Sequence, residues 1–424
     1  MKIYLDMIGC RLNQSEIEIL ARQFTAAGHS LVADPADADL AVVNTCTVTS
    51  AAAADSRKII RRISRKGVKN IISTGCWSEL YPEQALDLPG VTRVVSNAEK
   101  GQLVSDLLTL DSVEFDQEPL QRVTIPGSRQ RTRAFIKAQD GCRHHCTFCI
   151  TTVARGDSRS ETAETVIKEI DAAVQAGFKE VVLTGVQLGS WGKDFDSTWG
   201  LQDLVRQVLK NTDIPRLRLS SIEPWDVQPA LIELLQDGRV ARHLHLPLQS
   251  GSAATLRRMA RAINPEKFAL LVENIRSIVP EIALTTDILV GFPGETEEEF
   301  KESFDFISQM DFAAGHVFSY SAREGTPAAD YQDQIPHPIR KKRSAEIREL
   351  LNNSGETYRR HFLGSELVVL WEQVDEITQR AVGLTDNYLR VETHASQDLW
   401  NTFSRTKITE LAHEGVLGEI LDPE

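Results

Sequence analysis

Three cysteines lie close together near the middle of the chain, in the sequence DGCRHHCTFC. Cys142, Cys146 and Cys149 follow a C-x-x-x-C-x-x-C spacing, which lets one short loop wrap a single metal centre but is too crowded for strain-free disulfides. Three thiolates are one ligand short for tetrahedral zinc, whereas a cubane iron–sulfur cluster can keep its fourth iron open. The spacing therefore predicts a 4Fe-4S cluster with an open iron. The alternative is a zinc site that takes its fourth ligand from His144 or His145.

The other three cysteines each follow a short apolar run in the first hundred residues. The runs are KIYLDMIG, DLAVVNT and KNIISTG, and directly after them come Cys10, Cys46 and Cys76. Such runs are typical of buried parallel strands, and in open α/β sheets ligands bind beyond the carboxyl ends of the strands. We therefore expect these cysteines to converge on a second site. The alternative is that each one is an ordinary buried residue, because cysteine is often buried.

The elements that position these cysteines indicate α/β domains. Residues 1–112 alternate the three strands with helices near residues 14–27 and 51–64, which predicts an N-terminal open parallel α/β domain. Residues 113–129 lack periodicity and contain prolines and a glycine, so we expect a linker.

Two further domains are predicted beyond the linker. Residues 130–362 contain six strand-like runs separated by helical patterns, which predicts a partial (β/α)6 barrel with its active groups at the carboxyl ends of the strands. The first cysteine loop follows the first of these strands. Residues 363–424 read as short antiparallel strands with turns, which predicts a small antiparallel β-barrel.

Composition places the chain among soluble proteins. It has 424 residues, of which 42% are hydrophobic and 25% are charged, as expected for a globular protein of two or three domains. Neither an apolar run long enough to cross a membrane nor a signal-peptide pattern is found, so we expect a cytoplasmic protein without a membrane partner. Assigning all six cysteines to two metal sites fits a reducing compartment.

Charge is distributed unevenly along the sequence. The net charge is −13, and the segment from Gly364 onward has four basic and twelve acidic residues. Basic clusters lie in residues 57–69, beside the cysteine loop and in residues 340–343. They predict contacts with a polyanion such as RNA, and the candidate residues are Arg57, Arg61, Arg155, Arg159, Arg340 and Lys341. The alternative is that each cluster is a solvated face.

The sequence resembles the radical-SAM methylthiotransferase family. The likeness rests on MIGCRLNQSE, VVNTCTVTSAAAADSRKIIRR and STGCWSE, and on the cysteine loop with its aromatic Phe148 before the third cysteine. It implies that the loop cluster cleaves S-adenosylmethionine (SAM) to a 5′-deoxyadenosyl radical, and that Cys10, Cys46 and Cys76 hold an auxiliary 4Fe-4S cluster on which sulfur is mounted. It also implies a C-terminal TRAM-like domain, an RNA-binding module, although a net charge of −8 opposes binding of phosphate over its whole surface.

The resemblance and the strand-end positions together suggest contacts to SAM. Phe148 is expected against the adenine, and the residues expected at the methionine end or along the rim are Thr184, Gly185, Ser221, Glu223, Gln249, Asp287 and Gly291. The alternative for each is an ordinary turn, helix cap or barrel residue.

Several motifs resemble one branch of the family, which acts on threonylcarbamoyladenosine in tRNA. They are LTGVQLGSWG, RGDSRS and SAREGTP, although that branch usually has histidine and tyrosine where Gln187 and Trp191 stand here. The resemblance implies methylthiolation at C2 of adenosine 37, beside the anticodon, with electrons from a flavodoxin or ferredoxin. The alternatives are isopentenyladenosine in tRNA, an aspartate of a ribosomal protein, and a non-catalytic iron–sulfur or zinc protein that binds RNA.

Overall fold

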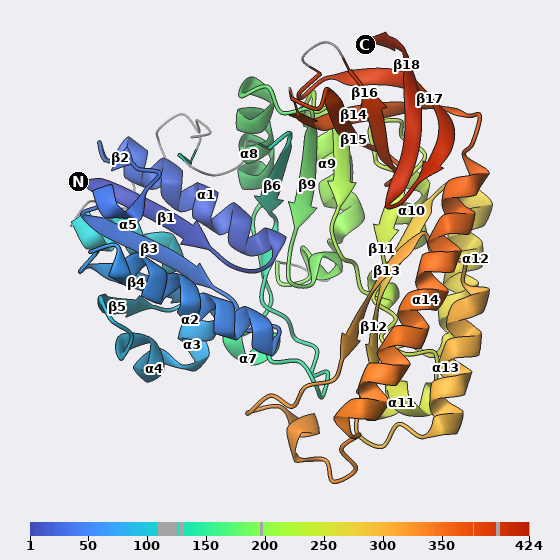
Figure 1. Cartoon of the computed structure of the whole chain (residues 1–424), viewed down its shortest axis with the longest axis horizontal. Helices are drawn as coiled ribbons and strands as arrows, with labels where there is room; N and C mark the ends of the chain where they lie inside the picture. The colour runs from blue at the N-terminus through green and yellow to red at the C-terminus, as the bar shows by residue number, and fades with distance from the viewer. Residues whose placement is uncertain (109–124, 127–130, 196–197, 376, 396–398, 424) are drawn as a thin grey trace.

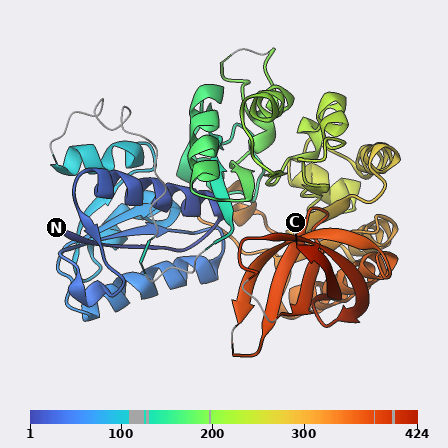
Figure 2. The same cartoon turned by 90° about the horizontal axis from the view of Figure 1, so that it is seen from above.

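The computed structural model describes residues 1–108, 125–126, 131–195, 198–375, 377–395 and 399–423. Figure 1 shows three domains in chain order: a blue N-terminal α/β domain, a central domain coloured from green to orange, and a red β-barrel. Figure 2 shows that the two smaller domains contact different parts of the central one. The predicted linker lies outside the described residues except for residues 125 and 126, and Ile125 packs on the N-terminal core. In the part of the chain that the structure describes, no helix has the length and apolar character to span a membrane.

The N-terminal domain is a parallel sheet with the strand order β2-β1-β3-β4-β5. Its strands are β1 (Lys2–Met7), β2 (Ser30–Leu31), β3 (Leu40–Thr45), β4 (Ile71–Gly75) and β5 (Val91–Val95). Its helices are α1 (Arg11–Ala26), α2 (Ser50–Arg65), α3 (Cys76–Leu80), α4 (Pro82–Leu86) and α5 (Leu103–Leu108). Every residue of β3 and β4 is buried, as expected for a sheet covered on both faces. The predicted domain type and its two long helices are therefore confirmed.

The central domain is an open barrel of six parallel strands. Its strands are β6 (Arg133–Lys137), β9 (Glu180–Thr184), β10 (Arg216–Leu219), β11 (His243–His245), β12 (Ala283–Val290) and β13 (Ala314–Ser319). Strands β6, β9 and β10 form one sheet and β11, β12 and β13 another, and a parallel bridge between Ser221 and His245 joins the two. The helices are α7 (Thr151–Arg155), α8 (Ala163–Gln175), α9 (Leu201–Asn211), α10 (Pro229–Leu234), α11 (Ala253–Arg258), α12 (Pro265–Ile278), α13 (Glu297–Gln309) and α14 (His337–His361). The predicted partial (β/α)6 barrel is confirmed.

Residues 366–423 form a closed barrel with the strand order β14-β15-β16-β18-β17. The strands are β14 (Glu366–Asp375), β15 (Arg380–Thr385), β16 (Arg390–His394), β17 (Phe403–Ala412) and β18 (Gly415–Pro423). All pairs are antiparallel except β16 with β18, which is parallel and closes the barrel. Trp371 is fully buried in its core and donates a hydrogen bond of 2.8 Å from Nε1 to the hydroxyl of Ser404.

The C-terminal barrel docks on the amino ends of the central strands. Arg133, the first residue of β6, forms an ion pair of 2.6 Å with Glu372. Arg216, the first residue of β10, donates to the carbonyl of Leu384 at 3.1 Å. Active groups of parallel barrels lie at the carboxyl ends. The C-terminal barrel is therefore at the opposite end of the central domain from the cysteine loop.

Candidate active site

The first cysteine triplet lies in a loop at the carboxyl end of β6. Two short strands, β7 (Gln139–Asp140) and β8 (Arg159–Ser160), pair with each other and close the segment that contains the loop and α7. Inside the loop, the N–H of Cys149 donates to the carbonyl of Cys146 at 3.0 Å, and the N–H of His144 donates to the sulfur of Cys142 at 3.3 Å. The loop therefore gathers its three thiols on one small region, as the spacing predicts.

The second triplet lies at the carboxyl ends of three adjacent strands of the N-terminal sheet. Cys10 precedes α1 after β1, Cys46 follows β3, and Cys76 starts α3 directly after β4. A β-carbon placed on Gly9 would lie 3.0 Å from the sulfur of Cys46, so the segment that carries Cys10 approaches Cys46 closely. The three cysteines therefore lie at the same edge of the sheet, and their convergence on one cluster site stays a prediction.

Burial raises the pKa of several of the cysteine thiols. Burial, with the neighbouring thiols adding to it, raises the pKa of Cys46 and of Cys142 to about 11. The pKa of Cys76 is also raised by burial, although Arg155 opposes the effect. These three thiols are therefore protonated at neutral pH, and a metal centre must displace their protons when it binds.

The side chains available at these sites can be compared with the needs of a cluster and of zinc. Among the described residues, no three histidine, cysteine, aspartate or glutamate side chains are close enough to hold one metal ion. His144, the alternative zinc ligand, accepts a hydrogen bond of 3.0 Å at Nε2 from the indole N–H of Trp225. Each site offers three thiols, which matches a cubane cluster held by three thiolates with one open iron.

A cavity of about 520 Å³ is lined by Cys149 of the loop and by a segment of the N-terminal domain close after Cys46. On the N-terminal side it is lined by residues 48–50, which follow Cys46 and begin α2. On the central side it is lined by residues 148–151 of the cysteine loop and by the ends of β12 and β13. A molecule in this cavity contacts both domains.

Three of the predicted SAM contacts line this cavity, namely Phe148, Gln249 and Asp287. The other five are not among the residues that line it in the described part of the chain. Thr184 donates from its hydroxyl to the carbonyl of Ile136 at 3.1 Å, and Gly185 lies against the side chain of Gln139.

The remaining three predicted contacts lie at other strand ends. Ser221 is half-buried and forms a parallel bridge with His245, the last residue of β11, and Glu223 forms an ion pair of 2.7 Å with Arg261. Gly291 has a φ of +69°, and a β-carbon there would overlap the side chain of Arg340. A direct role for each in SAM binding stays a prediction.

The structure corrects the prediction that Arg155 contacts RNA. Its side chain is 1% exposed, and its guanidinium donates to Glu16 at 2.6 Å and to Asp140 at 3.1 Å. The adjacent loop and the charge suggested an RNA contact, but the sequence does not show that the N-terminal domain covers this residue.

The other predicted RNA contacts remain accessible at least in part. Arg61, Arg159 and Lys341 are exposed. Arg57 is half-buried over the ring of Trp77, and Arg340 is half-buried and donates to the carbonyl of Tyr320.

Two residues that sequence reasoning did not select also contact the loop cysteines. Gln187 accepts from the thiol of Cys142 at 3.2 Å, and Arg261 approaches the sulfur of Cys146 to 3.9 Å while it packs over Trp225. Gln187 directly follows the turn after β9, so its strand-end position was the available signal. Arg261 follows α11 and carries no comparable signal.

Comparison with known proteins agrees with this architecture. Residues 136–307 match the Radical SAM superfamily, and residues 2–96 match Uncharacterized protein family UPF0004. A radical S-adenosylmethionine methyltransferase, TsrM, from Kitasatospora setae has a similar fold, with a TM-score of 0.60 and 16% identity over 77% of this chain and 75% of that one.

Similar proteins match over almost the whole chain. Threonylcarbamoyladenosine tRNA methylthiotransferase MtaB of Bacillus subtilis is 34% identical over 98% of this chain and 96% of its own length. The protein of the same name from Thermotoga maritima is 33% identical over 98% of this chain and 96% of its own length. A tRNA-2-methylthio-N(6)-dimethylallyladenosine synthase of Bacillus mycoides is 31% identical over 99% of this chain and 86% of its own length. The chain therefore belongs to the radical-SAM methylthiotransferase family.

Proposed function

We propose that this enzyme inserts a methylthio group at C2 of threonylcarbamoyladenosine 37 in tRNA. The observation that carries the proposal is the cavity of about 520 Å³, which is lined by the cysteine loop and by the segment after Cys46. A nucleoside held there contacts Cys149 of the loop and the segment that begins two residues after Cys46. This is the arrangement that a reaction on one carbon by two centres needs.

We propose that each triplet holds one 4Fe-4S cluster and that SAM binds beside the loop cluster. When bound, these groups supply a radical for hydrogen abstraction and a sulfur for insertion. The chain's own residues orient the reactants, with Phe148 against the adenine and Gln249 and Asp287 as polar contacts in the cavity.

Two arginines favour this substrate over isopentenyladenosine. Arg323 and Arg348 line the cavity, and guanidinium groups bind carboxylates with geometric specificity. A threonylcarbamoyl substituent carries a carboxylate, whereas an isopentenyl substituent is uncharged.

Basic residues extend from the cavity along two helices. Arg57 and Arg61 lie on α2, which begins at the cavity, and Arg340 and Lys341 lie at the start of α14. We propose that these residues, with Arg159, bind phosphates on either side of the target nucleoside. A flavodoxin or ferredoxin as electron donor and a cytoplasmic location complete the proposal, because the chemistry needs low-potential electrons and a reducing environment.

Nucleoside mass spectrometry of tRNA tests the proposal. The gene is expressed in a bacterial strain that lacks its own tRNA methylthiotransferases, and tRNA is digested and analysed for each methylthio nucleoside. We expect the methylthio derivative of threonylcarbamoyladenosine with the parent chain and none with Cys10→Ala or Cys142→Ala. Appearance of the methylthio derivative of isopentenyladenosine instead would support the alternative tRNA substrate.

A further inference from the structure

Arg155 connects the two cysteine sites through a direct contact. It is the last residue of α7, which begins two residues after Cys149, and its Nε donates to the sulfur of Cys76 at 3.3 Å. Its Nη2 donates to the amide oxygen of Asn13 at 2.8 Å, and the same oxygen lies 3.7 Å from the sulfur of Cys10. One buried guanidinium of the central domain therefore contacts Cys76 directly and Cys10 through Asn13.

We propose that Arg155 is a positioning residue for the auxiliary cluster, which it holds at a fixed place relative to the cysteine loop and whose reduction potential it raises. The inference rests on the auxiliary cluster proposed above. Hydrogen bonds to ligating sulfurs, together with nearby positive charge, stabilise the more negative reduced form of an iron–sulfur cluster. Arg155 supplies both to the sulfur of Cys76.

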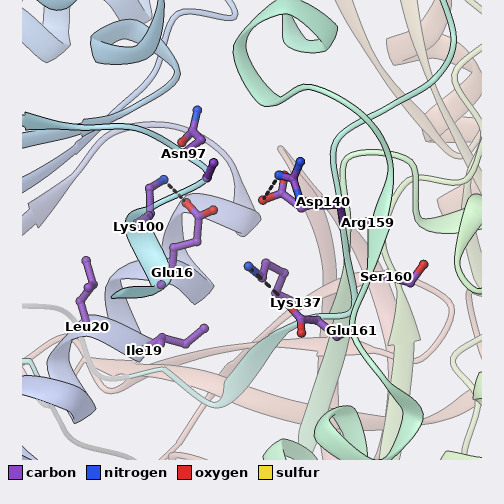
Figure 3. A pocket seen from close by; sticks show the side chains of 12 residues that line it. Glu16, Ile19, Leu20, Asn97, Lys100, Lys137, Asp140, Arg159, Ser160 and Glu161 are labelled. Atoms are coloured by element: carbon purple, nitrogen blue, oxygen red, sulfur yellow. Dashed lines mark hydrogen bonds and ion pairs between the residues drawn. The ribbon is translucent and has the colours of Figure 1, made fainter. Parts of the chain in front are cut away.

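The surrounding charges fix the orientation of this guanidinium. Glu16 binds both Arg155 and Lys100, and Asp140 binds Arg155 from the central domain. Figure 3 shows Glu16 and Lys100 on one side and Asp140 and Lys137 on the other side of a cavity of about 350 Å³. The carboxylates come from both domains, so they hold the guanidinium across the domain boundary.

A second contact keeps α7 against the N-terminal domain. The side-chain amide of Asn97 donates to the carbonyl of Ala154 at 2.7 Å, and both groups are buried. The segment from Cys149 to Arg155 is only one short helix long. Docking of its end on Cys76 therefore limits how far the two cysteine triplets can move apart.

A redox titration separates this role from a purely structural ion pair. The full chain with Cys142, Cys146 and Cys149 replaced by alanine carries only the auxiliary cluster, and its potential is followed by electron paramagnetic resonance. In this background we expect Arg155→Gln to shift the potential to a more negative value and Arg155→Lys to shift it less. Glu16→Gln leaves the guanidinium with Asp140 but removes a negative charge, so we expect a shift to a more positive value.

A matched control comes from another ion pair across the same boundary. Arg22 on α1 pairs with Glu169 on α8 at 2.5 Å, without contact to a cysteine, and Arg22→Gln should leave the potential unchanged. In the complementary background, with Cys10, Cys46 and Cys76 replaced, Arg155→Gln should leave the potential of the loop cluster unchanged.

The outcomes are distinguishable. An unchanged auxiliary potential in Arg155→Gln with its iron intact overturns the inference. If Arg155→Gln fails to bind iron, the test is the reduction potential of the auxiliary cluster in Glu16→Gln. A shift of this potential to a more positive value supports the inference, and an unchanged potential overturns it. If the parent background itself binds no cluster, the auxiliary site of the proposed function is wrong, and this inference falls with it.

Discussion

His243 and Tyr388 stack face to face, with ring centroids 4.1 Å apart and planes inclined by 6°. His243 is the first residue of β11, and Tyr388 lies in the turn between β15 and β16 of the C-terminal barrel. Burial holds the pKa of His243 well below its usual value, so the stacked ring is neutral. The face of the C-terminal barrel that carries Tyr388 is therefore committed to the central domain and is not a free surface for RNA.

Replacing Tyr388 with alanine should loosen the C-terminal barrel from the central domain. The loss of a stacked ring pair, with its contact to Arg218, should lower the free energy of unfolding by about 2 kcal/mol. Hydrogen exchange followed by mass spectrometry should show faster exchange in β15 and an unchanged cysteine loop. Tyr388→Phe keeps the ring and should exchange like the parent, and equal exchange in Tyr388→Ala would contradict a docking role.

Glu180 should make the stability of the enzyme depend on acid pH. It is fully buried at the start of β9, where Arg218 binds it at 2.7 Å and Arg216 lies 3.6 Å away. Burial alone would raise the pKa of Glu180, but these arginines outweigh burial and hold the pKa below its usual value of 4.5. The carboxylate therefore contributes stability above about pH 4.5, and this contribution is lost as the pH falls through the lower folded pKa.

Glu180→Gln measures this contribution. It leaves two buried arginines without their carboxylate, so we expect a loss of about 3–5 kcal/mol in the free energy of unfolding near pH 7. Denaturant titrations at several pH values should show that the difference in the free energy of unfolding between parent and variant becomes smaller as the pH falls below about 4.5. If this difference in the free energy of unfolding stays constant over the same pH range, ionisation of Glu180 does not stabilise the fold.

The cysteine sites could be predicted from the sequence because their position follows from local rules. Strand-like runs that end in cysteine predict convergence at one sheet edge, and the structure has this geometry at Cys10, Cys46 and Cys76. Strand-like runs separated by helical patterns likewise predict the six strands of the barrel. These features depend on residues that are close together in the sequence.

Contacts between residues that are far apart in the sequence could not be predicted in the same way. Arg155 resembles an exposed basic residue until Glu16 and Asn13 of another domain are placed around it. The parallel pairing of β16 with β18 was also not predicted, because alternation of polar and apolar residues does not identify a strand's partner. The burial of Arg155 and the partner of β16 both depend on contacts between residues that are far apart in the sequence. The local pattern of polar and apolar residues does not identify such contacts.

Removing one cysteine from each triplet should separate two activities. Cys10→Ala should keep SAM cleavage, measured as 5′-deoxyadenosine, but lose methylthiolation of tRNA. Cys142→Ala should lose both. Iron analysis after anaerobic reconstitution should give about eight irons per parent chain. Methylthiolation by Cys10→Ala at the parent rate would contradict the auxiliary site.

Gly75 should be essential for the position of Cys76. It has a φ of +93°, and a β-carbon there would overlap the backbone of Thr45 and the side chain of Asn44. Gly75→Ala must therefore displace the start of α3, and we expect iron per chain to fall by about half as the auxiliary cluster is lost. Gly67→Ala is the matched control, because Gly67 has a φ of +100° with nothing within 4 Å of the added carbon. The Gly67→Ala variant should lose only about 1–2 kcal/mol of stability through backbone strain, and it should keep all its iron. A full iron content in Gly75→Ala would contradict this prediction. It would show that the auxiliary cluster still forms when Cys76 is displaced from the end of β4.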